Sequence, residues 1–197
     1  MSFAMFIGGS KSGKSRLAQE MAEVLSVKGE KVCVAVFGDP AIDEEFARRI
    51  ELHKLTRPSA FQTIEAYSNP LKIFELAGDD VLLIDDLASA LGAIADQVFV
   101  DYELESLDVL DEEIASKIKE KFLIFCDQIL RRPSKTIVVS SELGMSLVSA
   151  SPAGRMFVDL LGLVNQMLVQ KAHQAYLVVA SRAIDLKDKP LEVYWKD

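Results

Sequence analysis

The sequence predicts an α/β fold in which helices cover a mostly parallel β-sheet. Two observations lead to this prediction. Short apolar runs alternate along the chain with longer segments of helical periodicity, and several of these runs are continuously apolar, as in strands buried on both faces. A length of 197 residues suits one domain, and no repeat, low-complexity segment or linker interrupts it. We therefore expect residues 1–197 to form a single domain.

The first part of the chain is predicted to run strand, helix, strand, helix. Residues 3–7 form a short apolar run suited to a buried strand, and the helix expected at 14–29 has apolar residues at helical spacing and ends at a glycine. Residues 31–37 are rich in β-branched side chains and predict the second strand. The helix expected at 43–55 opens with acidic residues, which stabilise a helix N-terminus.

The middle of the chain continues this alternation. A short strand is expected at 60–66, and residues 79–87 form an apolar strand that ends in two aspartates. A helix is predicted near 88–99. After an acidic stretch, a long amphipathic helix is expected at 114–132, and Pro133 ends it because proline cannot continue a helix.

The last third is predicted to contribute two strands, a helix and a hairpin. Residues 135–141 predict a strand, 154–172 a helix and 174–180 a further strand. The tail, 181–195, resembles a hairpin that turns at the KDKP sequence of residues 187–190, since proline and aspartate favour turns.

Composition and charge exclude several classes of protein. The formal net charge is −8, and because phosphate backbones bind basic surfaces, we expect no non-specific binding to nucleic acid. No stretch approaches the ~18 uninterrupted apolar residues of a membrane span, and the N-terminal residues lack the pattern of a signal peptide. Cys33 and Cys126 lie far apart without metal-ligand spacing, so reduced thiols are expected. These features predict a cytoplasmic protein.

The sequence GGSKSGKS at residues 8–15 lies between the first strand and the first helix. It matches G-x-x-x-x-G-K-[ST], the P-loop, whose glycines let backbone N–H groups point at phosphate oxygens. A Gly/Ser-rich turn would give the same letters by chance, but the flanking strand and helix favour a nucleotide site and a P-loop NTPase fold, a RecA-like three-layer sandwich. The candidate nucleotide-binding residues in this segment are Gly8, Gly9, Ser10, Lys11, Ser12, Gly13, Lys14 and Ser15, with Lys14 reaching the β- and γ-phosphates.

The two aspartates at the end of the 79–87 strand are candidates for a Walker B carboxylate. A carboxylate at the C-terminal end of an apolar strand can hold Mg²⁺ or its water, and Ser15 offers a hydroxyl to the same ion. We expect Asp85 to be this ligand, with Asp86 next to it. The alternative is a solvated turn acid, which is common at strand ends.

Several further segments resemble the signature motifs of one family. Residues 43–58 (DEEFARRIELHKLTRP), Thr63 with Glu65, the SELG sequence at 141–144 and RMFVDLLGLVNQ at 155–166 stand in the family's order. Together with the P-loop they resemble the bifunctional adenosylcobinamide kinase/adenosylcobinamide-phosphate guanylyltransferase family of cobalamin biosynthesis. The resemblance runs nearly from end to end of the chain.

The resemblance implies roles for residues outside the P-loop. His53 matches the family histidine that attacks the α-phosphate of GTP and carries GMP covalently, and a neutral imidazole is nucleophilic near pH 7. Without the resemblance, His53 would be read as a packing or capping residue of an amphipathic helix. The remaining nucleotide-binding candidates are Phe37, Gly38 and Asp39, where the family has a nucleotide-holding segment, together with Lys54, Arg57 and Glu65.

The implied reaction has two stages, in which ATP or GTP with Mg²⁺ phosphorylates adenosylcobinamide and GMP from GTP is then transferred to the new phosphate. The resemblance also implies a homo-oligomer, a trimer, and the apolar segments at 88–100 and 143–163 exceed what an ordinary surface exposes. Two alternatives stay open. One is a diverged P-loop kinase for another small molecule, and the other is a nucleotide-switched binding protein; in both, His53 is structural.

Overall fold

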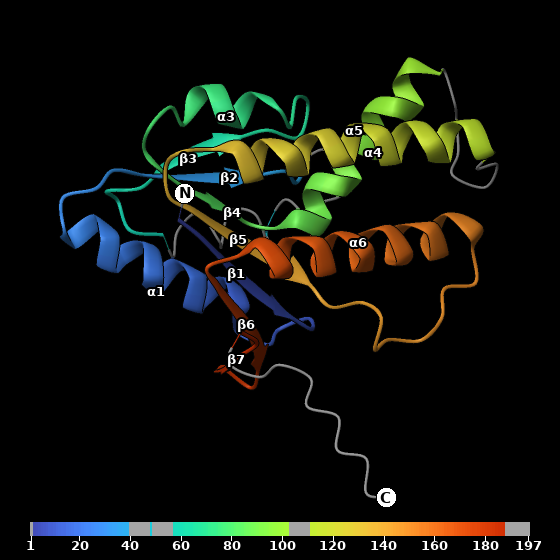
Figure 1. The fold of residues 1–197 in the computed structure, drawn as a ribbon. Helices are drawn as coiled ribbons and strands as arrows, with labels where there is room; N and C mark the ends of the chain where they lie inside the picture. Colours follow the sequence, from blue (N-terminus) through green and yellow to red (C-terminus); the bar gives the residue numbers. More distant parts are fainter. Residues whose placement is uncertain (1, 40–47, 49–56, 103–110, 188–197) are drawn as a thin grey trace, which may run out of the picture.

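The computed structural model describes residues 2–39, 48, 57–102 and 111–187 (Figure 1). Strands and helices alternate through most of this part of the chain. In chain order the elements are β1 (Phe3–Gly8), α1 (Lys14–Val27), β2 (Val32–Val36), β3 (Gln62–Glu65), α3 (Lys72–Leu76), β4 (Val81–Ile84), α4 (Leu87–Asp101), α5 (Glu112–Arg131), β5 (Thr136–Ser141), α6 (Pro152–Lys171), β6 (Gln174–Val179) and β7 (Arg182–Asp185).

The strands form one seven-stranded sheet in the order β3-β2-β4-β5-β1-β6-β7. Every neighbouring pair is parallel except β6 and β7, which are antiparallel. The predicted α/β class with a mostly parallel sheet is therefore confirmed. Because parallel strands end at the same edge, the residues after β1, β2, β4 and β5 lie near one another, which is where α/β folds bind ligands.

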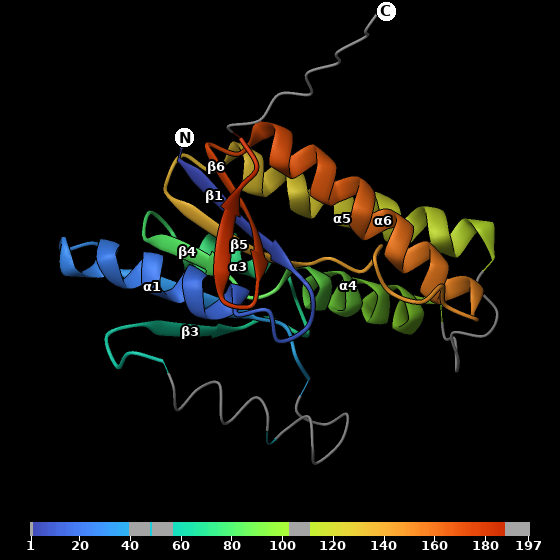
Figure 2. The same cartoon turned by 90° about the horizontal axis from the view of Figure 1, so that it is seen from below.

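Two apolar cores lie on opposite faces of the sheet. Along β1, Met5 and Ile7 pack into the core beneath α4, α5 and α6, whereas Ala4 and Phe6 pack into the core beneath α1. Figures 1 and 2 show the sheet between α1 and this group of three helices. Side chains of a strand point alternately to its two faces, so a strand buried on both faces is apolar throughout. This is the pattern of the first run in the sequence.

The helix ends agree with their capping chemistry. Asp86, Asp111 and Ser151 precede α4, α5 and α6, and each side chain accepts a hydrogen bond from a backbone N–H in the first turn. Such caps satisfy donors that the helix itself leaves unpaired. The helix expected at 43–55 falls outside the described residues except at Arg48. The short helix α3 was not predicted, because five residues are too few for a helical periodicity to be recognised.

The predicted hairpin turn at residues 187–190 lies outside the described residues except at Lys187, and the described residues contain a hairpin earlier in the chain. The antiparallel pair is β6 with β7, and the chain reverses between them at Ala180 and Ser181. Both residues have positive φ, 48° and 60°, which suits the right-handed twist of a two-residue hairpin. The sequence did not indicate this turn, because neither residue is the glycine or asparagine that usually takes such a conformation.

The apolar character of residues 88–100 has a different cause from the one expected. Leu91, Ile94, Val98 and Phe99 of α4 are buried in the chain's own core. The loop after β5 does expose apolar side chains, namely Met145, Leu147 and Val148, which are 83, 96 and 85% exposed. Among the helices of the described residues, none has the length and apolar content needed to cross a membrane.

Candidate nucleotide site

The segment between β1 and α1 forms a tight loop. β1 ends at Gly8 and α1 begins at Lys14, so Gly13 precedes the helix as its N-cap. Gly13 has φ of 97°, in the left-handed region that glycine adopts at little cost, and Lys11 also has a positive φ of 54°. These conformations turn the chain back on itself immediately before the helix N-terminus, where unpaired backbone N–H groups attract anions.

The hairpin of β6 and β7 braces this loop from behind. A Cβ atom on Gly8 would lie 2.5 Å from the carbonyl oxygen of Val178, and one on Gly13 would lie 2.6 Å from Oγ of Ser181. The backbone N–H of Ser181 donates to the carbonyl of Ser12 at 2.7 Å. The turn at Ala180 and Ser181 therefore supports the loop, and close packing requires glycine at both Gly8 and Gly13.

Two polar side chains of the loop are buried. Lys14 is 9% exposed, and its ammonium donates to the carbonyl oxygen of Gly9 at 3.3 Å. The hydroxyl of Ser12 is buried and has no hydrogen-bond partner within the described part of the chain. Buried polar groups are normally paired. A buried ammonium whose hydrogen bond goes to a carbonyl, together with a buried hydroxyl that has no partner, therefore points to a ligand that would complete their interactions.

The two aspartates after β4 have different surroundings. Oδ1 of Asp85 accepts a hydrogen bond from Oγ of Ser15 at 2.8 Å. Asp86 instead caps α4, because its Oδ1 accepts from the N–H of Ser89 at 2.8 Å, and its Oδ2 accepts from Oγ of Ser141 at 3.0 Å. Only Asp85 thus pairs with the P-loop serine, while Asp86 joins the start of α4 to the end of β5.

A cavity of about 930 Å³ opens at this edge of the sheet. It is lined by residues 10–16, by residues 36–38 at the end of β2, by Arg57, and by Asp85, Asp86, Ser89, Ser141 and Leu143. Its volume is in the range of a site for a nucleotide-sized ligand. We call it the phosphate cavity.

Arg57 brings a cation from outside the P-loop segment to the phosphate cavity. Burial lowers the pKa of the Arg57 guanidinium, and the Asp85 carboxylate acts in the opposite direction. Its Nη1 donates to Oγ1 of Thr63 at 3.3 Å. Among the described residues, the lining of the cavity therefore carries four cationic side chains and two carboxylates, namely Lys11, Lys14, Arg16 and Arg57, with Asp85 and Asp86.

The structure does not bring every predicted residue to this cavity. Glu65, the last residue of β3, is exposed and is not part of the lining, and Asp39 lines a neighbouring cavity instead. Gly9 has open space beyond its Cα, so no close packing requires a glycine there. His53 and Lys54 lie outside the described residues.

Ser141 and Asn165 belong to segments that the sequence analysis identified, but only the structure gives them contacts at the site. Asn165 of α6 is buried, and its Oδ1 accepts from Oγ of Ser140 at 2.7 Å while its Nδ2 donates to the carbonyl of Ser141 at 3.1 Å. Since β5 lies between β4 and β1 in the sheet, Asn165 fixes the end of the strand between the P-loop and Asp85. Sequence order alone does not reveal this strand order.

The chain matches known proteins over nearly its whole length. A family model described as cobinamide kinase / cobinamide phosphate guanyltransferase matches residues 4–186. The bifunctional adenosylcobalamin biosynthesis protein CobU of Salmonella typhimurium is 30% identical over 186 residues, which are 91% of this chain and 97% of that protein. The bifunctional adenosylcobalamin biosynthesis protein CobP of Pseudomonas aeruginosa is 28% identical over 190 residues, 95% of this chain and 98% of that protein.

Among solved structures, a KaiC-like protein of Pyrococcus horikoshii covers 89% of this chain and 70% of its own, with a TM-score of 0.46 and 17% identity. The family match, in contrast, includes the P-loop, Asp85, Arg57, Ser141 and Asn165 within one continuous range. The chain therefore belongs to the cobinamide kinase / cobinamide phosphate guanyltransferase family.

Proposed function

We propose that this protein is a transferase with two activities, in which ATP or GTP phosphorylates the aminopropanol hydroxyl of adenosylcobinamide and GMP from GTP is then transferred to that phosphate. Membership of the family supports the reaction class. The observation that carries the proposal is the phosphate cavity, in which the P-loop, Asp85 and Arg57 share one wall. This arrangement suits a nucleoside triphosphate whose phosphates react at the edge of the sheet.

The roles of the residues follow from the charge of the triphosphate. The backbone N–H groups of residues 10–15 and the start of α1 bind phosphate oxygens, and the ammonium of Lys14 moves from Gly9 to the β- and γ-phosphates. Arg57 lines the same cavity and offers its guanidinium to the same ligand. Because these groups are fixed before the reaction begins, they stabilise the charge that spreads over the phosphoryl oxygens in the transition state.

The donor set beside the P-loop fits Mg²⁺. Ser15 and Asp85 offer a hydroxyl and a carboxylate oxygen, and Mg²⁺ prefers oxygen ligands and completes its shell with substrate phosphates and water. When bound, the ion neutralises charge between the β- and γ-phosphates. The hydrogen bond between Ser15 and Asp85 holds the two candidate ligand oxygen atoms close together. Asp86 is instead hydrogen-bonded by Ser89 and Ser141.

We assign the second stage to His53 on the basis of the family resemblance. Its imidazole nitrogen attacks the α-phosphorus of GTP, the bond to the β-phosphate oxygen breaks, and pyrophosphate leaves. A phosphate oxygen of adenosylcobinamide phosphate then attacks the same phosphorus, and the P–N bond breaks. Two displacements of this kind allow one nucleotide site to serve both substrates.

Intact mass spectrometry after incubation with GTP and Mg²⁺ tests this assignment. We expect the wild-type protein to gain the mass of one GMP, and His53→Ala to gain none. His173→Ala is the matched control, because His173, the second histidine of the chain, is exposed, and its Nδ1 only accepts a hydrogen bond from the N–H of Phe3. That variant is expected to carry GMP as the wild type does.

Added cobinamide separates the outcomes. Loss of the GMP adduct with formation of a guanylylated product supports both stages. Phosphorylated cobinamide without any adduct would leave a kinase in which His53 has another role. Slow GTP hydrolysis with neither product would favour the nucleotide-switched binding protein and contradict the proposal.

We further propose that the chain assembles as a homotrimer. Met145, Leu147 and Val148 form an exposed apolar patch next to Leu143, which lines the phosphate cavity, and monomers rarely expose such patches. Light scattering during size exclusion is expected to give three times the 21.8 kDa of one chain. Leu147→Glu is expected to lower this mass, and a wild-type mass of one chain would contradict the proposal.

A further inference from the structure

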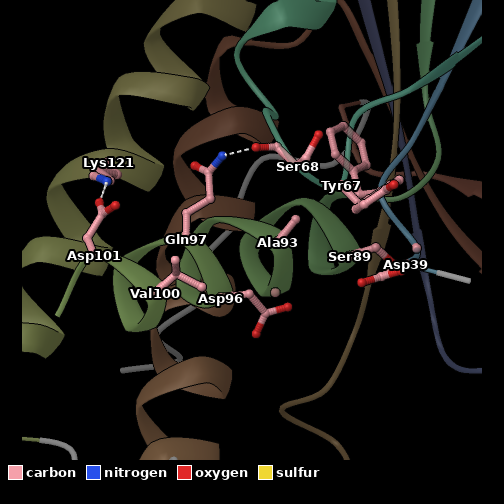
Figure 3. Close-up of a pocket in the computed structure, with 13 residues that line it drawn as sticks. Asp39, Tyr67, Ser68, Ser89, Ala93, Asp96, Gln97, Val100, Asp101 and Lys121 are labelled. Atoms are coloured by element: carbon pink, nitrogen blue, oxygen red, sulfur yellow. Dashed lines mark hydrogen bonds and ion pairs between the residues drawn. The ribbon is translucent and has the colours of Figure 1, made fainter. Parts of the chain in front are cut away.

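A second cavity, which we call the α4 cavity, lies along one side of α4 (Figure 3). Its volume is about 710 Å³. Its walls include Asp39 after β2, Tyr67 after β3, and Ser89, Gly92 and Asp96 of α4. The sequence analysis gave Phe37, Gly38 and Asp39 to the nucleotide, but the family motifs quoted for this chain do not include α4, which supplies much of the remaining lining.

The α4 cavity adjoins the phosphate cavity. Phe37, Gly38 and Ser89 line both of them. One end of a molecule bound in the α4 cavity would therefore lie next to the residues that line the phosphate cavity. This is the position that the acceptor of a phosphoryl group requires, because the acceptor and the phosphate must be held within reach of one another.

The walls of the α4 cavity select for a particular chemistry. Figure 3 shows Asp39 next to Ser89, with Asp96 about two helical turns further along α4. Asp39 and Asp96 both line the cavity. Burial raises the pKa of the Asp96 carboxyl, and the charge of Asp39 raises it further. Carboxylates accept hydrogen bonds and repel anions, whereas Ala93 and Val100 add apolar surface.

We propose that the α4 cavity binds the acceptor substrate. The substrate offers neutral hydrogen-bond donors, and Asp39 and Asp96 accept from hydroxyl and amide groups of a corrinoid side arm. This inference rests on the proposed function, which makes cobinamide the acceptor. Cobinamide carries both kinds of group, with one hydroxyl on its aminopropanol arm and several primary amides. The same carboxylates keep a second nucleotide out of the acceptor cavity by repelling its phosphates.

Gly92 provides a direct test. It lies inside α4 and lines the cavity, and a Cβ there would have no atom within 4 Å. Leucine is a good helix former, so Gly92→Leu fills part of the cavity without displacing the core. We expect the dissociation constant for cobinamide, measured by equilibrium dialysis and its visible absorbance, to rise at least tenfold. The dissociation constant for GTP, measured calorimetrically, is expected to stay within twofold.

Gly162→Leu is the matched control. Gly162 is also a helical glycine with open space beyond its Cα, but it lies on α6 and lines neither the α4 cavity nor the phosphate cavity. Both dissociation constants are expected to stay within twofold of the wild type. Asp96→Asn is a second test that keeps the volume of the side chain. It is expected to weaken cobinamide binding about threefold or more and to leave GTP binding unchanged, and it decides the matter if Gly92→Leu does not fold.

Three results would overturn the inference, and they differ from one another. Wild-type affinity for cobinamide in both Gly92→Leu and Asp96→Asn would remove the α4 cavity as the acceptor site while leaving the proposed function intact. Weakened GTP binding in a folded Gly92→Leu would assign the cavity to the nucleotide. A wild-type protein that binds GTP but neither binds nor phosphorylates cobinamide would contradict the proposed function and this inference together.

Discussion

Replacing Lys14 with alanine is expected to weaken GTP binding about 100-fold or more and to abolish phosphorylation of cobinamide. The ammonium is buried beside the P-loop, and the hydrogen bond it makes in the free protein goes to the carbonyl of Gly9. No carboxylate of the described residues forms an ion pair with it. Losing one partner of a buried charge-assisted interaction costs about 2 to 5 kcal/mol. In Lys14→Ala the lost partner is the ammonium, and the triphosphate is left without it.

We expect Lys14→Ala to weaken GTP binding without lowering the stability of the nucleotide-free protein. Because the substitution removes a buried cation without an acidic partner, the free energy of unfolding without nucleotide is expected to stay the same or rise. Chemical denaturation measures this, and titration calorimetry measures the affinity for GTP. Lys11→Ala removes the same charge from an exposed position of the loop and is expected to weaken binding less than about fivefold. Equal losses in the two variants would contradict a specific role for Lys14.

Replacing Gly13 with alanine is expected to destabilise the protein by about 2 to 5 kcal/mol and to weaken GTP binding. Two costs add. The φ of 97° is in the left-handed region, where a Cβ costs about 1 to 2 kcal/mol. The new atom would also lie 3.1 Å from Cα of Ser181, and overpacking typically costs about 1 to 3 kcal/mol. Relief requires the loop to move away from the turn between β6 and β7.

Gly9→Ala is the matched control for this prediction. It lies in the same loop, but its φ is not positive and no atom lies within 4 Å of the position of its Cβ. Its unfolding free energy is expected to change by less than about 0.5 kcal/mol, as for substitutions away from special features. Thermal and denaturant unfolding of the two variants measure the difference. A stability loss in Gly9→Ala as large as in Gly13→Ala would show that the hairpin does not brace the loop.

Some features of the site could be predicted because they depend on neighbours in the sequence. The P-loop needs glycines at its bend and a lysine and serine at the start of the helix, and all of these lie within residues 8–15. The strand before Asp85 is apolar because it is buried on both faces. Asp85 could be placed at the edge of the sheet because it directly follows this apolar strand.

Other features depend on residues that are distant in the sequence. Ser181 contacts the P-loop about 170 residues away, so the turn at Ala180 and Ser181 is stabilised by a partner that no local pattern reveals. Glu65 and Asp39 both follow strands, and the sequence does not state which cavity each faces. The sequence favoured Asp85 over Asp86, but the contacts that separate the two, with Ser89 and Ser141 engaging the second carboxylate, come from the structure.

By itself, the sequence determined that this chain forms an α/β fold with a phosphate-binding loop after its first strand, since backbone conformation and alternating burial are local properties. Only the tertiary structure decided how the loop is braced, what Asp86 contacts instead of Ser15, and that the α4 cavity adjoins the phosphate cavity. The reason is the order of strands in the sheet. It places β5 between β1 and β4, and it thereby brings together side chains that are far apart along the chain.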